Sequence, residues 1–491
     1  FRQESHRNVM RLFLLLALVV AETALALTAT ERLTAAIKQA IDTVDLVNVV
    51  AEDTIGTDKN PHTQIANENS KDAQKIGDIV QEATRLLVAE HGAAGLAQFN
   101  GIDILGVIEK HLGPKFNNRK KRQYGSELPP QDNCINRPPT CDRSFPFRSI
   151  SGWCNHDDTP NRGMGSTMGF IRRFMGAAKY DDGFNSVRRL SANGGQLPSA
   201  RAISNKILAE GAIPAFDPLY NHMFMQYGQW IAHDLIFTPS AVGINGASLD
   251  CSLCESADLT PNCAPIEVPA DDTYFPTKTA AGKKNCIRVT RGINGQTGLG
   301  PRAQINQNSH FLDLSQVYGS TDCVAKELRT MKDGQMLMFT ADGYTLPPKA
   351  LNDTNCQSAK VNSAFKCFTA GDSRNSLQPG LIPIHTIYLR QHNKWASQIR
   401  QLRPTWSDNL VYEETRRLLV AMYQYHIYAD YLPKVVGTKL MAQYDLTPGS
   451  LRRLYDSRIN PSITAEFGTA AFRFGHSQAR KDVPRMTNSN V

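Results

Sequence analysis

The stretch QYGQWIAHDLIFT, residues 226–238, places His233 and Asp234 inside an apolar and aromatic run. Its spacing predicts a helix on which Gln229 and His233 lie four residues apart and share a face. Asp234 lies about a third of a turn further round and points to a different side. A buried carboxylate needs a partner, because an unpaired buried charge is costly. A lone His on an apolar helix is more often a core residue than a catalyst, so other segments must decide its role.

The composition of the whole chain is that of a globular protein. Of its 491 residues, 41% are hydrophobic and 20% are charged, as is usual for such proteins. Amphipathic stretches at 218–237, 383–401 and 413–432 predict helices, the last of them ending at Pro433. Strand-like alternation is sparse. The net charge of +8 is spread along the chain, which does not indicate nucleic-acid binding.

The first 26 residues predict secretion. Arg11 precedes an apolar run at 12–21, and small residues follow at 24–26, which is the order found in signal peptides. The run is too short to span a bilayer, so we interpret residues 10–26 as the signal peptide of a secreted, extracellular protein without a transmembrane anchor. Residues 1–9 resemble no targeting element and are interpreted as a translated upstream stretch.

A cysteine-free segment follows the signal peptide. Apolar residues recur in it with helical spacing between positions 76 and 87. It ends in four basic residues, 119–122, which suit the acidic subsites of a subtilisin-like processing protease cutting at Arg122. A solvated charge run is the usual alternative. Because the run coincides with the start of the cysteine-containing region, we interpret residues 27–122 as a helical propeptide and residues 123–491 as the main domain.

All ten cysteines lie after residue 122. An even number in a secreted chain indicates disulfides, because thiols there meet an oxidising environment. Cys251 and Cys254 could instead form half of a zinc site, but no second pair follows at zinc spacing. The sequence therefore predicts a mainly α domain with little β structure and with loops tied by disulfides.

A second polar segment is SHFLDLSQVYGST, residues 309–321, in which Ser309, Phe311, Asp313 and Ser315 alternate. From an extended loop, their side-chain and backbone oxygens can converge on one point. Such an oxygen-rich set suits Ca²⁺. A turn whose hydroxyl and carboxylate groups satisfy local backbone N–H groups is the alternative.

Two further segments carry residues suited to an anionic ligand. In FTAGDSRNS, residues 368–376, Arg374 follows a Gly-Asp-Ser turn ahead of a helix. In TAEFGTAAFRFGHS, residues 464–477, Arg473 and His476 are three apart and face the same way. With small residues beside them, they suit a flat anionic ligand with an axial imidazole, whereas a core His is the alternative.

Taken together, these segments resemble a known family. GQWIAHDLIFTP, HFLDLSQVYGS, AGDSRNS and AAFRFGHS, in this order, are similar to the signature elements of the animal haem peroxidases. CDRSFPFRSISGWCN, YDDGFNSVR and HTIYLRQHNKWA extend the resemblance, which covers about residues 141–480. The implied fold is a helical core around a buried haem.

The resemblance also implies a role for each matching residue. The residues that match the catalytic group are His233, Gln229 and Arg374. Those that match the haem-binding group are the iron ligand His476 and the propionate partner Arg473. Those that match the calcium ligands are Asp234, Ser309, Phe311 through its carbonyl, Asp313 and Ser315.

The activity implied by the resemblance is that of a secreted peroxidase. Its partners would be H₂O₂ and small reducing substrates, namely phenolic or tyrosyl donors or anions such as iodide and thiocyanate, oxidised through a ferryl haem intermediate. The implied cofactors are haem b and Ca²⁺. The alternative is a non-catalytic secreted haem-binding or adhesion module that retains the fold, although such a module would have no chemical need for all four of His233, Gln229, Arg374 and His476.

The sequence departs from the family pattern at three positions. Many vertebrate members bind haem covalently through an Asp and a Glu, where this chain has Ala232 and Leu377, and Gln378 stands where one member has a haem-linked Met. We therefore expect haem to be held non-covalently. The family also continues well beyond its proximal histidine, so the domain 123–491 is expected to be incomplete at its C-terminal end.

Similarity further suggests four disulfides and leaves two cysteines over. The four suggested pairs are Cys141 with Cys154, Cys251 with Cys263, Cys254 with Cys286, and Cys356 with Cys367. Cys134 and Cys323 are then assigned to each other by exclusion alone. Asn352 begins the single N-glycosylation sequon.

Overall fold

The computed structural model describes a large part of the chain. The described residues are 27–55, 66–112, 141, 144–156, 162–174, 176, 180–208, 217–243, 246–341, 343–350, 367–449 and 455–480. The predicted signal peptide at 1–26, the basic cluster at 119–122 and the sequon at Asn352 lie outside them. No helix in the described ranges is both long and apolar enough to cross a bilayer.

The segment before the cysteine-rich region forms helices, as its spacing predicts. They are α2 (Ala29–Ile55), α3 (Glu68–Gly95), the 3₁₀ turn η1 (Leu96–Phe99) and α4 (Ile104–Leu112). Helix α3 begins at the N-cap Asn67, whose side chain accepts a hydrogen bond from the Ser70 N–H at 2.8 Å. The helical interpretation of this segment is confirmed, whereas its removal as a propeptide stays a prediction.

The rest of the chain is also mostly helical. Its helices, in chain order, are α6 (Ala200–Ile207), α7 (His222–Leu235), α8 (Ser256–Leu259), α9 (Ser315–Tyr318), α10 (Asp322–Glu327), α12 (Leu381–Leu402), α13 (Asp408–His426), η4 (Ile427–Tyr431), α14 (Leu432–Val436), α15 (Thr438–Gln443), α16 (Ala465–Thr469) and η6 (Ala471–Gln478). The strands are β1 (Ile266–Glu267), paired antiparallel with β2 (Cys286–Ile287), and β3 (Phe339–Ala341), paired antiparallel with β4 (Tyr344–Leu346). The mainly α prediction is confirmed.

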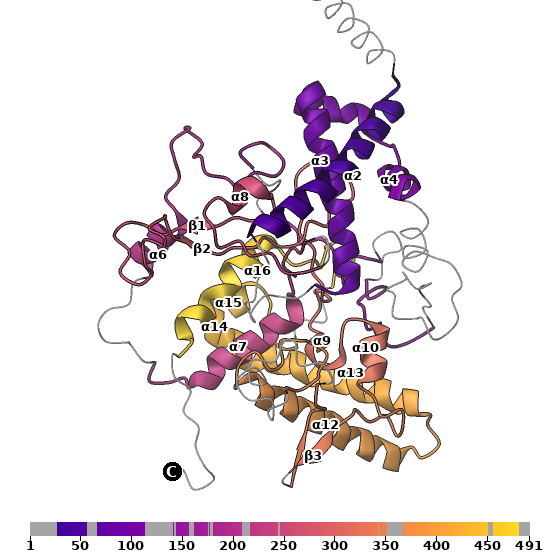
Figure 1. Cartoon of the computed structure of the whole chain (residues 1–491). Coiled ribbons are helices and arrows are strands. Elements are labelled where there is room, and N and C mark those ends of the chain that lie inside the picture. Colours follow the sequence, from indigo (N-terminus) through magenta and orange to yellow (C-terminus); the bar gives the residue numbers. More distant parts are fainter. Residues whose placement is uncertain are drawn as a thin grey trace, which may run out of the picture.

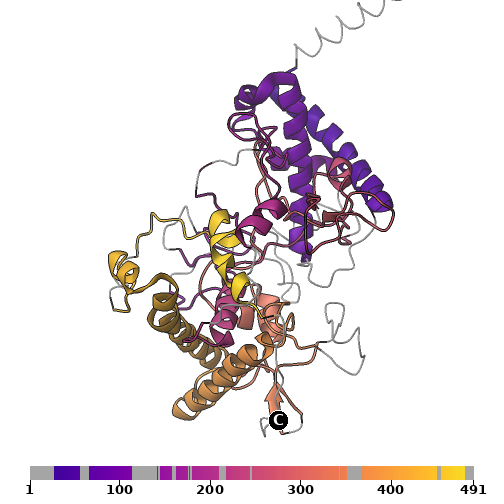
Figure 2. The same ribbon diagram turned by 90° about the vertical axis from the view of Figure 1, so that its left-hand side faces the viewer.

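Helix α7 lies at the centre of the molecule. Figures 1 and 2 place the indigo N-terminal helices at one end, α12 and α13 at the other, and α7 between them. Trp230 of α7 is fully buried and stacks on Tyr388 of α12, with ring centroids 5.0 Å apart. The same cluster continues into Leu419 and Tyr423 of α13. The helix that carries His233 is therefore fixed against the main apolar core.

The prediction that the helix before Pro433 ends there is wrong. Helix α13 ends at His426, a π-helical turn spans Ile427–Tyr431, and α14 begins at Leu432 with Pro433 in its first turn. The first residues of a helix have no intrahelical acceptor for their N–H groups, so a residue without an N–H is tolerated there. Pro433 thus lies at the second position of α14, directly after the π turn, and does not end the helical run.

Three of the disulfides suggested by similarity are present, namely Cys141–Cys154, Cys251–Cys263 and Cys254–Cys286. Cys323 and Cys367 are also disulfide-bonded. Their suggested partners, Cys134 and Cys356, lie outside the described residues.

Buried histidines make the fold sensitive to acid. His392 is fully buried, with one ring nitrogen 2.8 Å from the Tyr318 hydroxyl and the other 2.9 Å from the Gly334 carbonyl oxygen. Burial lowers the pKa of His392 to about 4, and burial likewise lowers the pKa of His385 to about 4. Both are therefore neutral in the folded protein at neutral pH.

We expect the melting temperature to fall as the pH is lowered from about 6.5, the ordinary pKa of His, towards 4. The unfolded chain takes up protons over this range and the folded chain does not, so stability from these groups is complete above the unfolded pKa and is lost below it. Scanning calorimetry across this range measures the effect. Between pH 7 and pH 4, the melting temperature of the variant His392→Gln should fall by less than that of the wild type. An equally large fall in the variant would contradict the assignment.

Candidate active site

His233 lies on the last turn of α7, which begins at the N-cap Asn221. It is 5% exposed, and its Nδ1 atom has no hydrogen-bond partner among the described residues. Burial lowers the pKa of His233 well below its ordinary value, and the charge of Arg374 lowers it further. The ring is therefore neutral at physiological pH and can accept a proton.

The carbonyl groups at the end of α7 are held by side chains from distant segments. A helix leaves its last carbonyls without intrahelical donors. Asn308 donates to the His233 carbonyl at 2.7 Å, the Ser315 hydroxyl donates to the Asp234 carbonyl at 3.0 Å, and Asn306 donates to the Leu235 carbonyl at 2.7 Å. This capping fixes the position of the turn that carries His233.

Arg374 is the second support of this turn. Its guanidinium donates to the carbonyls of His233 at 3.1 Å and Ile236 at 2.9 Å, and it forms an ion pair with Asp372 at 2.5 Å. It also lies 4.5 Å from the centroid of the Phe237 ring. Burial alone would raise the pKa of Asp372, but the charge and hydrogen bonds of Arg374 hold it well below its ordinary value. Arg374 thus reaches the predicted site and is held there by a carboxylate.

Asp234 points away from His233 and towards α9, as its helical position predicts. Its carboxylate accepts hydrogen bonds from the Ser315 N–H at 2.7 Å, the Ser315 hydroxyl at 2.8 Å and the Leu314 N–H at 3.2 Å. Asp313 lies on the same loop and accepts hydrogen bonds from Ser309 at 2.6 Å and the Ser315 N–H at 3.1 Å. Four of the five residues matched to calcium ligands therefore meet at one place.

The electrostatics of this cluster suit a cation. Burial raises the pKa of Asp234 well above its ordinary value, and the nearby charge of Asp313 raises it further. Burial also raises the pKa of Asp313. Leu314, between Asp313 and Ser315, adopts a left-handed backbone with φ of 59°, which is unusual for a non-glycine residue and typical of functional loops. A cation would allow both carboxylates to be ionised.

The ligand types point to a hard cation. In the described ranges, no group of three His, Cys, Asp or Glu side chains is placed to hold a metal ion. An ion here would therefore bind two carboxylates together with serine and carbonyl oxygens, a set that suits Ca²⁺. The Phe311 carbonyl, the fifth predicted ligand, accepts a hydrogen bond from the Asp313 N–H at 3.0 Å.

Gln229 belongs to a cluster of three amides. Its Oε1 atom accepts hydrogen bonds from Gln378 at 3.0 Å and Gln226 at 3.2 Å. Gln378 also donates to the side chain of Gln226. Sequence reasoning identified Gln378 only as the replacement of a haem-linked residue, but the structure shows that it holds the side chain of Gln229.

Arg473 and His476 lie on η6, which packs against α7. A Cβ atom placed on Gly475 would lie 3.9 Å from Met225 of α7. A 3₁₀ helix has three residues per turn, so Arg473 and His476 share a face as predicted. His476 is exposed to solvent over much of its surface. Neighbouring groups still partly desolvate its ring, which lowers its pKa, and the charge of Arg473 lowers it further. A neutral imidazole of this kind can bind a metal.

The two guanidinium groups leave this region with excess positive charge. Burial lowers the pKa of Arg473, and the like charge of Arg374 lowers it further. Arg374 is paired with Asp372, whereas no carboxylate in the described ranges forms an ion pair with Arg473. An anionic group such as a haem propionate fits this surplus.

The structure brings some of the predicted residues together and not others. No hydrogen bond or ion pair between described residues joins Gln229 or His476 to His233; Gln229 contacts Gln226 and Gln378, and His476 lies near Arg473. His233, Arg374 and Arg473 lie within electrostatic reach of one another, and Asp234 joins α7 to the cluster around Asp313. Sequence reasoning missed the roles of Asp372 and Asn308, which contact Arg374 and the backbone of His233. A separate cavity of about 1050 Å³ lies between α2, α3 and the loops at 181–200 and 254–267, and none of the predicted site residues lines it.

Comparisons with known proteins show the family of the chain. The family described as "Animal haem peroxidase" matches residues 147–491. Heme peroxidase 2 of Caenorhabditis elegans is 43% identical over 448 residues, covering 87% of this chain and 60% of that protein. Chorion peroxidase of Aedes aegypti is 34% identical, covering 69% and 43%, and human myeloperoxidase is 31% identical, covering 85% and 54%. The chain thus spans about half the length of these relatives.

Proposed function

The chain belongs to the animal haem peroxidase family, and we propose that it is a peroxidase that uses H₂O₂ to oxidise phenolic or tyrosyl donors or small anions such as iodide and thiocyanate. The observation that carries the proposal is His233, a buried neutral imidazole whose helix end is fixed by Asn308 and Arg374. Such fixation matters because proton transfer requires a well-positioned base.

In this proposal the residues of the chain move protons and hold charge. Neutral His233 accepts a proton from one oxygen of H₂O₂ and returns it to the other oxygen as the bond between them breaks. Arg374, which is always charged, stabilises the negative charge that develops. Gln229, held by Gln378 and Gln226, offers its amide to the peroxide or to water without adding charge.

The overall reaction balances without a further reactant. One H₂O₂ takes up two electrons and two protons and becomes two molecules of water. Two phenols each lose one electron and one proton and become phenoxyl radicals. Haem b, when bound, supplies the redox chemistry for these electron transfers. His476 would hold the iron and Arg473 a propionate, as the donor set and the surplus positive charge of this region support.

The calcium site forms part of the same proposal. Ca²⁺ would bind next to the end of α7, to the side chains of Asp234, Ser309, Asp313 and Ser315 and to the carbonyl of Phe311. Two buried carboxylates in one loop cluster support this assignment.

We further propose that the protein is secreted, glycosylated at Asn352 and cleaved at Arg122. The disulfides support secretion, because such bonds persist in oxidising compartments.

A reconstitution assay tests this function. The full chain is loaded with haem, and the Soret absorbance at about 400 nm, a property of the cofactor, is recorded before guaiacol or iodide is oxidised with H₂O₂. Soret absorbance together with turnover is the expected result. Normal absorbance without turnover would instead indicate a non-catalytic haem-binding module, and no Soret band would contradict haem binding.

The mode of haem attachment can be measured on the same sample. Ala232 and Leu377 carry no carboxyl group that could form an ester with haem. We expect acidified organic solvent to extract all of the haem from the loaded protein. Haem that stays with the polypeptide after denaturing electrophoresis would contradict the non-covalent assignment.

A further inference from the structure

The N-terminal module, defined as the described residues 29–55 and 66–112 with α2, α3, η1 and α4, has an apolar core of its own. Leu33 and Ile37 of α2 pack with Ile79 and Val80 of α3, and all four are fully buried. Phe99 and Ile108 extend the cluster into η1 and α4. The helices of the module are therefore held to one another by the module's own apolar contacts.

A second apolar cluster joins the module to the main body. Ala66 and Ala73 of the module pack with Val242, Ile293 and Ile305 of the body, and the three aliphatic side chains are 1–6% exposed. If the module left, these side chains would be exposed to water, which opposes dissociation.

The side-chain amide of Gln74 in α3 forms two hydrogen bonds with the backbone of Val242. Its side-chain nitrogen donates to the Val242 carbonyl at 2.7 Å, and its side-chain oxygen accepts from the Val242 N–H at 2.9 Å. Gln74 is 4% exposed, so water does not replace either bond in the assembled protein. Loss of this side chain would leave two buried backbone groups unpaired, which is costly.

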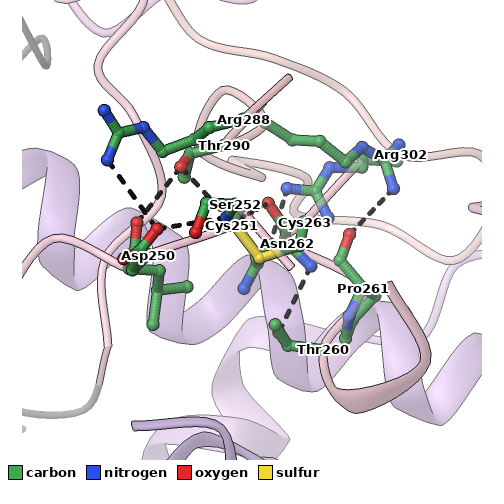
Figure 3. The surroundings of a disulfide bond; sticks show 12 residues. Asp250, Cys251, Ser252, Thr260, Pro261, Asn262, Cys263, Arg288, Thr290 and Arg302 are labelled. Carbon is green, nitrogen blue, oxygen red and sulfur yellow. Dashed lines mark hydrogen bonds and ion pairs between the residues drawn. A yellow bond between two sulfur atoms is a disulfide. The ribbon is translucent and has the colours of Figure 1, made fainter. Parts of the chain in front are cut away.

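Asp78, one turn further along α3, brings a carboxylate to a buried arginine. Its Oδ2 atom accepts a hydrogen bond from Asn262 at 3.3 Å, and Asn262 in turn accepts from Arg302 at 2.8 Å. Figure 3 shows Asn262 and Arg302 beside the Cys251–Cys263 disulfide, which fixes this loop. Burial lowers the pKa of Arg302 to about 10, whereas the negative charge of Asp78 opposes that shift. Burial raises the pKa of Asp78, and the charge of Arg302 opposes that shift. The module thus contributes a buried carboxyl group that is linked to Arg302 through Asn262.

Gly77 allows the two backbones to touch. A Cβ atom on Gly77 would lie 2.1 Å from the Asn294 carbonyl oxygen, and the Asn294 side chain donates to the Gly77 carbonyl at 2.9 Å. Such a close approach requires glycine at this position. Because alanine favours an isolated helix over glycine, this residue serves the contact at the expense of the helix.

The start of α3 reaches the loop that supports His233. The Asn67 N–H at 3.0 Å and the Ser70 hydroxyl at 2.8 Å both donate to the side-chain oxygen of Gln307. The Gln307 N–H donates to the Phe237 carbonyl at 2.7 Å. Gln307 lies between Asn306 and Asn308, the two residues that hold the last carbonyls of α7. The module therefore contacts the active-site support directly.

We propose that the N-terminal module remains bound after the proposed cleavage at Arg122, on which this inference rests, and acts as a non-covalent subunit that supports the loop 306–308 behind α7. Its apolar contacts, the Gln74 and Asp78 hydrogen bonds and the close approach at Gly77 make it an integral part of the protein. The attachment is non-covalent, because residues 27–122 contain no cysteine.

The association can be measured without relying on natural processing. A recognition sequence for a site-specific protease is inserted after Arg122 in the full chain, which is then cut. We expect the two fragments to co-elute in gel filtration under native conditions and to separate on a denaturing gel without reductant. Separate elution of the two fragments of the cut wild-type chain under native conditions would overturn the proposal.

Two substitutions test whether the named contacts hold the fragments together. Gln74→Ala and Gly77→Ala should each weaken the association by about tenfold or more, a large effect on the scale of binding constants. Gln39→Ala, on an exposed face of α2, is the matched control and should leave it unchanged. Gly77→Ala is informative because it favours the helix, so its effect cannot come from unfolding of α3. Unchanged affinity in both interface variants would contradict this interface.

Hydrogen exchange gives a readout that does not depend on activity. The Val242 N–H is bonded to Gln74, and the Phe237 N–H is bonded to Asn306 at 2.7 Å. In the cut wild-type protein both N–H groups should exchange as slowly as in the uncut chain, because the module stays in place. Fast exchange at Val242 after cutting would show that the module has left.

Discussion

Replacement of His233 by alanine is expected to lower the peroxidase turnover of the haem-loaded protein by about 10²- to 10⁴-fold, the contribution of a positioned general acid or base. The imidazole is buried and neutral, because burial and the charge of Arg374 lower its pKa. Alanine removes the group that moves the proton between the two peroxide oxygens. The haem content should stay close to that of the wild type, because His476 lies on a different element, η6.

A second buried imidazole provides the control. His385 of α12 is 3% exposed, and its ring lies 4.6 Å from that of Trp230 on α7. His385→Gln removes an imidazole of similar burial from the same region. A charged His385 would lower the pKa of His233, but burial keeps His385 neutral near pH 7 and it is not a proposed proton carrier, so turnover at that pH should persist. Steady-state oxidation of guaiacol, normalised to Soret absorbance, measures both variants. Equal losses in His233→Ala and His385→Gln would mean that packing, and not proton transfer, explains the effect.

Local parts of this site could be predicted from sequence because they depend on short spacing. The helix at 218–237 corresponds to α7, His222–Leu235, and the helix at 383–401 corresponds to α12, Leu381–Leu402. The different directions of His233 and Asp234 follow from the helical period alone. The pairing of Asp234 with a loop 81 residues away was accessible only through the family resemblance, since spacing carries no information on distant contacts.

The remaining contacts could not be predicted because they join segments far apart in the chain. Ser70 and Gln307 are 237 residues apart, and Gln229 and Gln378 are 149 apart. Neither segment carries a motif that marks the partner, since polar residues at helix starts and in loops usually satisfy local backbone groups. Pro433 was misjudged for a different reason: the preceding π turn, Ile427–Tyr431, leaves it at the start of a new helix. Such wide turns have no simple sequence signal.

Replacement of Asp234 by alanine is expected to lower the free energy of unfolding by about 1–3 kcal/mol, the cost of leaving a buried donor without its acceptor. Its carboxylate accepts hydrogen bonds from the Leu314 N–H, the Ser315 N–H and the Ser315 hydroxyl, all of them buried. Alanine leaves the Leu314 N–H without this acceptor, whereas the Ser315 N–H keeps Asp313 and the Ser315 hydroxyl keeps the Asp234 backbone carbonyl. It also removes one of the two carboxylates proposed to bind Ca²⁺. Urea denaturation of the wild type and the variant measures the difference.

The isosteric variant Asp234→Asn separates cation binding from hydrogen bonding. Asparagine keeps one acceptor oxygen but lacks the charge that a calcium ion requires. After treatment with a chelator, added Ca²⁺ should raise the melting temperature of the wild type, because a ligand at 100 times its dissociation constant stabilises by about 2.7 kcal/mol. The same addition should leave Asp234→Asn unchanged.

The surface variant Asp258→Asn, at the exposed position of α8, makes the same chemical change away from the cluster and should keep the full response to Ca²⁺. If Asp234→Asn responded to Ca²⁺ as strongly as Asp258→Asn, the ion would have to bind elsewhere. If the chelated wild type did not respond, Asp234 and Asp313 would have to share a proton instead of a cation. The raised pKa values of Asp234 and Asp313 would then mean that the pair holds a proton in the folded protein. Lowering the pH, and not adding Ca²⁺, would then stabilise the end of α7.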